Sequence, residues 1–143
     1  MTRTVAGVHI TPDGNRTDAV VPTDHLTEFF KKHLGGWPEY AHYGTTDSAV
    51  CVVVHETSMS DGHAPNVLAT KAVERIMGRG LSYNLRGAVV LVGYQPRTDT
   101  LIDLSGDQRS IIEALTQDED VRAWQMYMAG MTASPTPRRG GVA

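Results

Sequence analysis

The sequence has few cysteines and no long apolar stretch, and these absences exclude disulfide bonds and membrane-spanning helices. Cys51 is the only cysteine among 143 residues, so no intrachain disulfide can form, and a lone thiol suits a reducing compartment. No apolar stretch approaches the length of a membrane span. Residues 1–4 lead into no apolar segment of the kind that signal peptides carry. We therefore expect a cytoplasmic protein with no membrane association.

A strong charge of either sign is also missing. The formal net charge is −3, whereas a nucleic-acid binder generally presents a broad basic surface. Nucleic acid is therefore not the expected partner, and a regulator that uses Arg75, Arg79 and Arg86 is the weakest of our hypotheses. The hydrophobic content of 41% is enough to build a core, so we expect a folded chain.

The middle of the chain carries the strongest fold signal. Residues 49–54 and 88–92 are short, non-alternating apolar runs rich in β-branched residues, which is typical of strands buried on both faces. Between them, residues 67–77 place apolar side chains at helical spacing. These runs predict an α+β domain, with a mixed or antiparallel sheet of about five strands covered by helices at 24–34 and 66–77. If the two core strands are adjacent and parallel, their connection should be right-handed.

Further elements flank this centre. Residues 4–21 contain Asp13-Gly14 between two β-rich runs, which predicts a hairpin. Thr23 is the expected N-cap of the first helix, and Pro38 places the aromatic strand at 37–43 near a sheet edge. Residues 99–104 could form another strand. We expect a single domain over 1–131, with a helical addition at 105–131 that begins at a capping box, and a disordered tail over 132–143.

Two short motifs carry a resemblance to a known family. They are Asn66-x-x-Ala69-Thr70 and the Gly87-Ala88-Val89-Val90 that opens the last core strand. With Pro12-Asp13-Gly14 and Leu34-Gly35-Gly36 before them, residues 5–93 resemble the uncharacterised family called domain of unknown function 3846. Members commonly have Arg or Pro where this chain has Val67, and the acidic loop before the motif is longer here. The family is found in actinobacteria and their phages, so the resemblance implies a mobile-element accessory protein and no particular chemistry.

Four possible metal ligands lie within nine residues, where a core strand runs into a loop: His55, Glu56, Asp61 and His63. Two imidazoles with one or two carboxylates could hold a divalent ion. The spacing matches no closed zinc motif, and histidines and acids in a loop are commonly only solvated.

A small ligand could bind at the start of the central helix. Asn66 and Thr70 could hold an anion at the helix N-terminus, with Arg86 nearby. Capping of the helix by Asn66, with Thr70 bonded to the backbone, explains the same two residues. The sequence predicts no cofactor and no catalytic residue.

Two aromatic segments are candidate partner surfaces. The first comprises Trp37, Tyr40 and Tyr43 on the predicted edge strand, which ordinary sheet packing would also explain. The second is the last helix, where Trp124 and Met128 lie on an apolar face that either docks on the core or forms an interface, including that of a homodimer. The favoured hypothesis is a non-catalytic accessory protein of a phage or mobile element that binds a host or element-encoded protein. The alternative is a metal- or small-ligand-binding protein, or an enzyme, that uses loop 55–63 and the N-terminus of the helix at 66–77.

Overall fold

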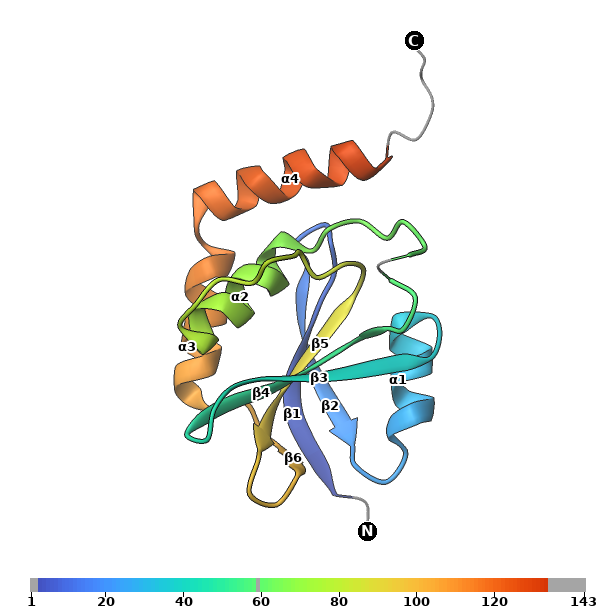
Figure 1. The fold of residues 1–143 in the computed structure, drawn as a ribbon, viewed down its shortest axis with the longest axis vertical. Coiled ribbons are helices and arrows are strands. Elements are labelled where there is room, and N and C mark those ends of the chain that lie inside the picture. The colour runs from blue at the N-terminus through green and yellow to red at the C-terminus, as the bar shows by residue number, and fades with distance from the viewer. Residues whose placement is uncertain (1–2, 59, 134–143) are drawn as a thin grey trace.

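One antiparallel sheet organises the chain. The computed structural model describes residues 3–58 and 60–133, with side chains as far as Met128, and has an α+β fold (Figure 1). In the described residues the sheet has six strands in the order β2-β1-β5-β4-β3, with β6 paired to β5. The strands are β1 (Thr4–Ile10), β2 (Arg16–Pro22), β3 (Pro38–Thr45), β4 (Ser48–His55), β5 (Val89–Gln95) and β6 (Thr100–Ile102).

The two apolar runs form the adjacent strands β4 and β5 at the centre of the sheet. They pair antiparallel, with Val52 opposite Leu91, so the question of a right-handed crossover does not arise. Successive side chains of a strand point to opposite faces. Val50 and Val52 accordingly join one core cluster, and Cys51 and Val53 join the other. Burial on both faces, which the non-alternating runs predicted, is confirmed.

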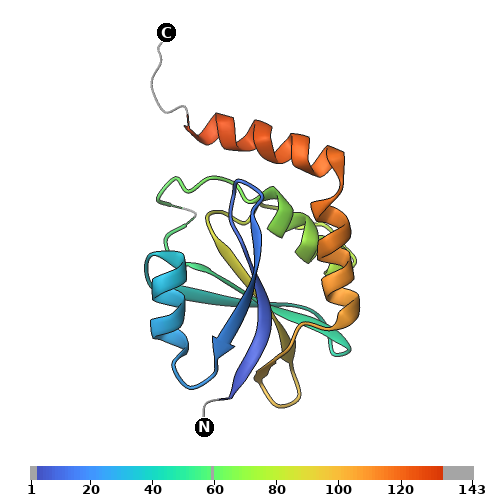
Figure 2. The same cartoon turned by 180° about the vertical axis from the view of Figure 1, so that it is seen from behind.

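Helices cover both faces of this sheet. Helix α1 (Leu26–Leu34) lies on one face, and α2 (Val67–Met77) and α3 (Gly106–Thr116) lie on the other (Figures 1 and 2). The predicted cover by two helices is confirmed, and α3 adds a third. Helix α4 (Glu119–Ala133) runs across one end of the molecule, above the turn between β1 and β2 in Figure 1.

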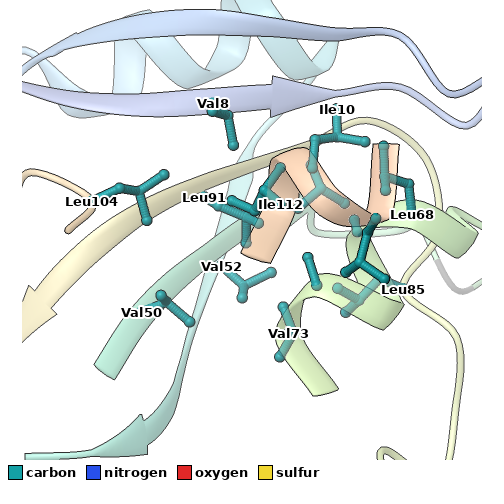
Figure 3. Close-up of a cluster of buried hydrophobic side chains, with 14 residues drawn as sticks. Val8, Ile10, Val50, Val52, Leu68, Val73, Leu85, Leu91, Leu104 and Ile112 are labelled. Carbon is teal, nitrogen blue, oxygen red and sulfur yellow. The ribbon is translucent and has the colours of Figure 1, made fainter. Parts of the chain in front are cut away.

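The larger core cluster lies between the sheet and α2 with α3. Figure 3 shows Val52 and Leu91 from the central strands meeting Leu68 and Val73 of α2 and Ile112 of α3. All five are at most 2% exposed. Their burial ties the predicted helical addition to the central strands of the sheet.

The start of the first helix differs from its prediction. Helix α1 begins at Leu26 after His25, which makes no side-chain cap hydrogen bond. Thr23, the predicted N-cap, instead donates from its N–H and its hydroxyl to the carbonyl of Arg3, at 2.9 and 3.0 Å. The hydroxyl thus extends the pairing of β1 with β2 rather than capping the helix.

The predicted helical addition begins as expected. Ser105 and Gln108 form a complete capping box at the start of α3. Helix α4 runs to Ala133, two residues beyond the predicted end of the domain, and the rest of the predicted disordered tail, 134–143, lies outside the described residues. Among the helices that the structure describes, none combines the length and apolar character needed to cross a membrane.

Candidate functional site

The loop between β4 and α2 brings three of the four predicted metal ligands together. Each of His55, Asp61 and His63 offers a donor atom, and these atoms lie within 4.8 Å of one another. The two imidazole rings are half-buried, with centroids 5.1 Å apart, and the carboxylate is exposed. Glu56 does not belong to this group. Its N–H still donates to the carbonyl of Trp37 at 2.9 Å, so its backbone continues the strand pairing, and neighbouring side chains of an extended chain point apart.

Thr57, which no sequence motif marked, links two members of the group. Its hydroxyl donates to Oδ2 of Asp61 at 2.5 Å and lies 2.9 Å from Nδ1 of His55. The Thr57 N–H also donates to that Nδ1, at 3.1 Å. One residue therefore orients both the imidazole and the carboxylate. Only its position two residues after a strand-ending histidine could have indicated this.

Two glycines make room for the imidazole rings. A Cβ at Gly36, just after α1, would overlap the Nε2 side of His55. A Cβ at Gly87, just before β5, would lie 2.6 Å from Nδ1 of His63. Gly87 also has a φ of +74°, which disfavours a side chain. The rings thus lie against backbone from segments that are distant in the sequence.

The structure does not place Asn66 and Thr70 where a ligand could reach them. Asn66 is fully buried, and its Nδ2 donates to the carbonyls of Ile10 at 2.9 Å and Gly87 at 2.8 Å. Its Oδ1 accepts from the N–H of Ala69. The Thr70 hydroxyl donates to the carbonyl of Asn66 at 2.8 Å and accepts from the N–H of Leu85 at 2.9 Å. Both side chains bind the chain's own backbone, which is the capping role that the sequence also allowed.

A second N-terminal N–H of α2 that an anion would use is also occupied. The N–H of Leu68 donates to Oε1 of Gln125 at 3.2 Å. This contact comes from α4, so no local sequence signal indicated it. The predicted anion site at the N-terminus of α2 is thereby filled by protein groups.

Arg86, the third predicted ligand-binding residue, supports the loop instead. Its Nη1 donates to the carbonyl of His63 at 3.0 Å. It also borders a shallow cavity of about 210 Å³ beside β3 and β4, with Tyr40, Tyr43 and Tyr83. Burial beside this cavity is the main cause that raises the pKa of Tyr43, and the hydrogen bond to Tyr83 raises it further. The Tyr43 phenol therefore stays protonated at neutral pH.

The aromatic residues of the edge segment do not form one surface. β3 lies at the edge of the sheet, as predicted. Tyr40, however, stands edge-on to Phe30 of α1, at a centroid distance of 5.7 Å, whereas Tyr43 packs against the core cluster on the α2 face. Positions 40 and 43 differ by an odd number, so on a strand they point to opposite faces. Trp37 is 55% exposed, with Nζ of Lys31 4.3 Å from its ring centroid.

Helix α4 presents its aromatic side chains outward. Trp124 is 47% exposed, Met126 76% and Tyr127 57%, and the two aromatic rings stack at 5.3 Å. Met128 is half-buried, and the buried residue of this stretch is the polar Gln125, at 3% exposure. Of the two roles that the sequence allowed for this face, docking on the core or exposure as a surface, the structure shows exposure for Trp124 and partial burial for Met128.

No protein-family model, curated protein or solved structure matches the chain. The resemblance to domain of unknown function 3846 therefore stays a prediction.

Proposed function

We propose that this chain is a small, non-catalytic accessory protein that acts by binding another protein. The α4 surface, defined as Trp124, Met126 and Tyr127, is its recognition element. The observation that carries this proposal is the exposure of all three side chains, given above, within four consecutive residues. Tryptophan, tyrosine and methionine are enriched in protein interfaces. Replacing an interface tryptophan or tyrosine by alanine often costs over about 1 kcal/mol of binding energy.

The way α4 is held supports a role in recognition. Gln125 fixes the helix to the body of the protein, with Oε1 bonded to Leu68 and Nε2 to the carbonyl of Thr11 at 3.3 Å. The neighbouring aromatic rings are thus presented on an anchored backbone. A surface that is ordered before binding loses less conformational entropy when a partner binds.

The single cysteine gives no support to a catalytic alternative. Cys51 is fully buried in β4, and burial raises the pKa of its thiol to about 12. A nucleophilic cysteine needs thiolate character and access to its substrate. The assignment to a phage or other mobile element, and hence to a host or element-encoded partner, depends on the sequence resemblance.

A pull-down from host lysate, read by mass spectrometry, tests this proposal. The bait is the full chain, compared with a Trp124→Ala, Tyr127→Ala double variant. Trp37→Ala is the matched control, because it removes an exposed tryptophan from the β3 end of the molecule. We expect one partner to be enriched by the wild type and by Trp37→Ala, and to be lost with the double variant.

The affinity for that partner, purified, then gives the quantitative test. We expect Kd to rise at least tenfold in the double variant, which corresponds to about 1.4 kcal/mol. Circular dichroism and thermal unfolding establish that the variant is folded. A folded double variant with undiminished affinity contradicts the proposal, and loss of binding in Trp37→Ala alone would move the recognition element to the β3 edge.

A further inference from the structure

The donor set of the β4–α2 loop matches the preference of one class of ion. Imidazole nitrogens suit zinc, copper, nickel and iron, and a carboxylate is a common additional ligand of zinc. Calcium and magnesium prefer sites made of oxygen atoms alone. Two imidazoles and one carboxylate, from His55, His63 and Asp61, therefore favour a divalent transition-metal ion.

The spacing of the donor atoms is close to what such an ion requires. Ligand atoms held at about 2.1 Å from zinc in a tetrahedral site lie about 3.4 Å apart. The three donor atoms here lie within 4.8 Å of one another, so the widest separation has to close by about 1.4 Å at most. Asp61 is exposed on the loop, and a small movement of its side chain disturbs no core packing.

The two imidazoles are held by groups outside the loop tip. His55 ends β4, where its backbone pairs with Pro38. The carbonyl of His63 accepts from Arg86, and Gly87 lies against the Nδ1 side of its ring, which leaves Nε2 as the nitrogen for a metal. A site whose ligands are held in this way loses little conformational entropy on binding.

Thr57 supports two members of the group. Ligand side chains of metal sites are commonly held by hydrogen bonds from neighbouring groups. Nε2 of His55 lies against Gly36, so Nδ1 is the nitrogen for a metal. Nδ1 accepts from the N–H of Thr57 at 3.1 Å, a bond that the ion would replace, and it lies 2.9 Å from the Thr57 hydroxyl. The same hydroxyl donates to Oδ2 of Asp61, which leaves Oδ1 available.

We propose that His55, Asp61 and His63 form a mononuclear site for a divalent transition-metal ion, with zinc as the expected occupant. Three protein ligands leave at least one coordination position open to water or to a donor from another molecule, as in zinc sites that exchange ligands. This site is separate from the α4 surface, and neither proposal depends on the other.

Zinc titration of the untagged, metal-free protein tests the proposal by calorimetry and native mass spectrometry. We expect one equivalent to bind. Asp61→Asn, His63→Ala and His55→Ala should each weaken binding more than tenfold, and Thr57→Val, which removes the supporting hydroxyl, should weaken it about tenfold. Cobalt gives a second readout, because Co²⁺ bound by nitrogen and oxygen ligands absorbs visible light and the bands should be lost in the ligand variants.

Two matched controls distinguish this site from other places where metal could bind. Glu56→Gln changes the neighbouring acid, which the structure leaves out of the group. His25→Ala removes an exposed histidine at the start of α1. Both should keep wild-type affinity. Absence of saturable binding at one equivalent overturns the proposal. So does binding that survives Asp61→Asn and His63→Ala, or that falls equally in Glu56→Gln.

Discussion

Oε1 of Gln125 accepts a hydrogen bond from the backbone N–H of Leu68 at 3.2 Å, which joins the last described helix to the first turn of α2. Nε2 of the same side chain donates to the carbonyls of Thr11 and Pro12 in the turn between β1 and β2. One buried amide thus connects three segments. In this way α4 is attached through a polar contact while its aromatic side chains remain exposed.

Gln125→Ala should therefore lower stability more than an ordinary change on a helix surface. It removes the partners of the buried Leu68 N–H and of the Pro12 carbonyl, whereas the Thr11 carbonyl still accepts from the N–H of Gly14. Unsatisfied groups of this kind cost about 1–3 kcal/mol. We expect the free energy of unfolding, measured by urea denaturation, to fall by about that amount. Gln117→Ala, on an exposed position at the end of α3, is the control and should change it by less than about 0.5 kcal/mol. Equal stability of the two variants would contradict this role.

Asn66→Ala should be more damaging still. Asn66 caps α2 through Ala69 and donates to the carbonyls of Ile10 and Gly87, so it joins the helix to β1 and to the segment before β5. We expect a loss of about 2–4 kcal/mol in chemical denaturation. Asn66→Asp separates the two roles, because a carboxylate keeps the cap but cannot donate to the carbonyls. An aspartate variant as stable as the wild type would show that the cap alone matters.

Acidification should destabilise the fold partly through His9. Burial, and then the proximity of His33 with its ring centroid 5.8 Å away, lowers the pKa of His9 below the ordinary value of 6.5. The unfolded chain therefore binds this proton more readily, and stability falls as the pH drops from 6.5 through the lowered pKa. In the described residues Nε2 of His9 is buried without a hydrogen-bond partner. His9→Phe should flatten the pH dependence of the unfolding free energy below pH 6.5. An unchanged slope would show that other groups cause this pH dependence.

The Cys51 thiol should react only when the protein unfolds. It is fully buried, and its pKa is raised to about 12, so little thiolate is present at neutral pH. We expect a thiol reagent to label the native protein at a rate that follows the opening equilibrium, and to label it rapidly in urea. Rapid labelling under native conditions would show that β4 opens locally.

The sequence predicted those elements whose signal is local. The non-alternating runs at 49–54 and 88–92 identified β4 and β5 because each strand has apolar neighbours on both faces. Their antiparallel pairing was not predictable, since it depends on where the other strands lie. The N-cap at Thr23 failed for a similar reason, because the backbone of Arg3 competes for its hydroxyl.

The candidate sites divide in the same way. The clustering of His55, Asp61 and His63 follows from their positions along one loop, so the sequence could suggest it. Gln125, which accepts from an N–H at the N-terminus of α2, lies on a helix far along the chain. No local sequence pattern could therefore indicate this contact. The split between Tyr40 and Tyr43, in contrast, was available from strand parity alone.

The position of β1 has a consequence for how this protein is made. β1 lies between β2, its hairpin partner, and β5, to which it pairs through Val8 and Leu91. During synthesis the hairpin therefore leaves the ribosome with one edge and one apolar face uncovered until β5 has followed. Unpaired strand edges of this kind favour aggregation. Slower translation just after β5 should thus increase the yield of native protein, whereas a pause before it should increase aggregation.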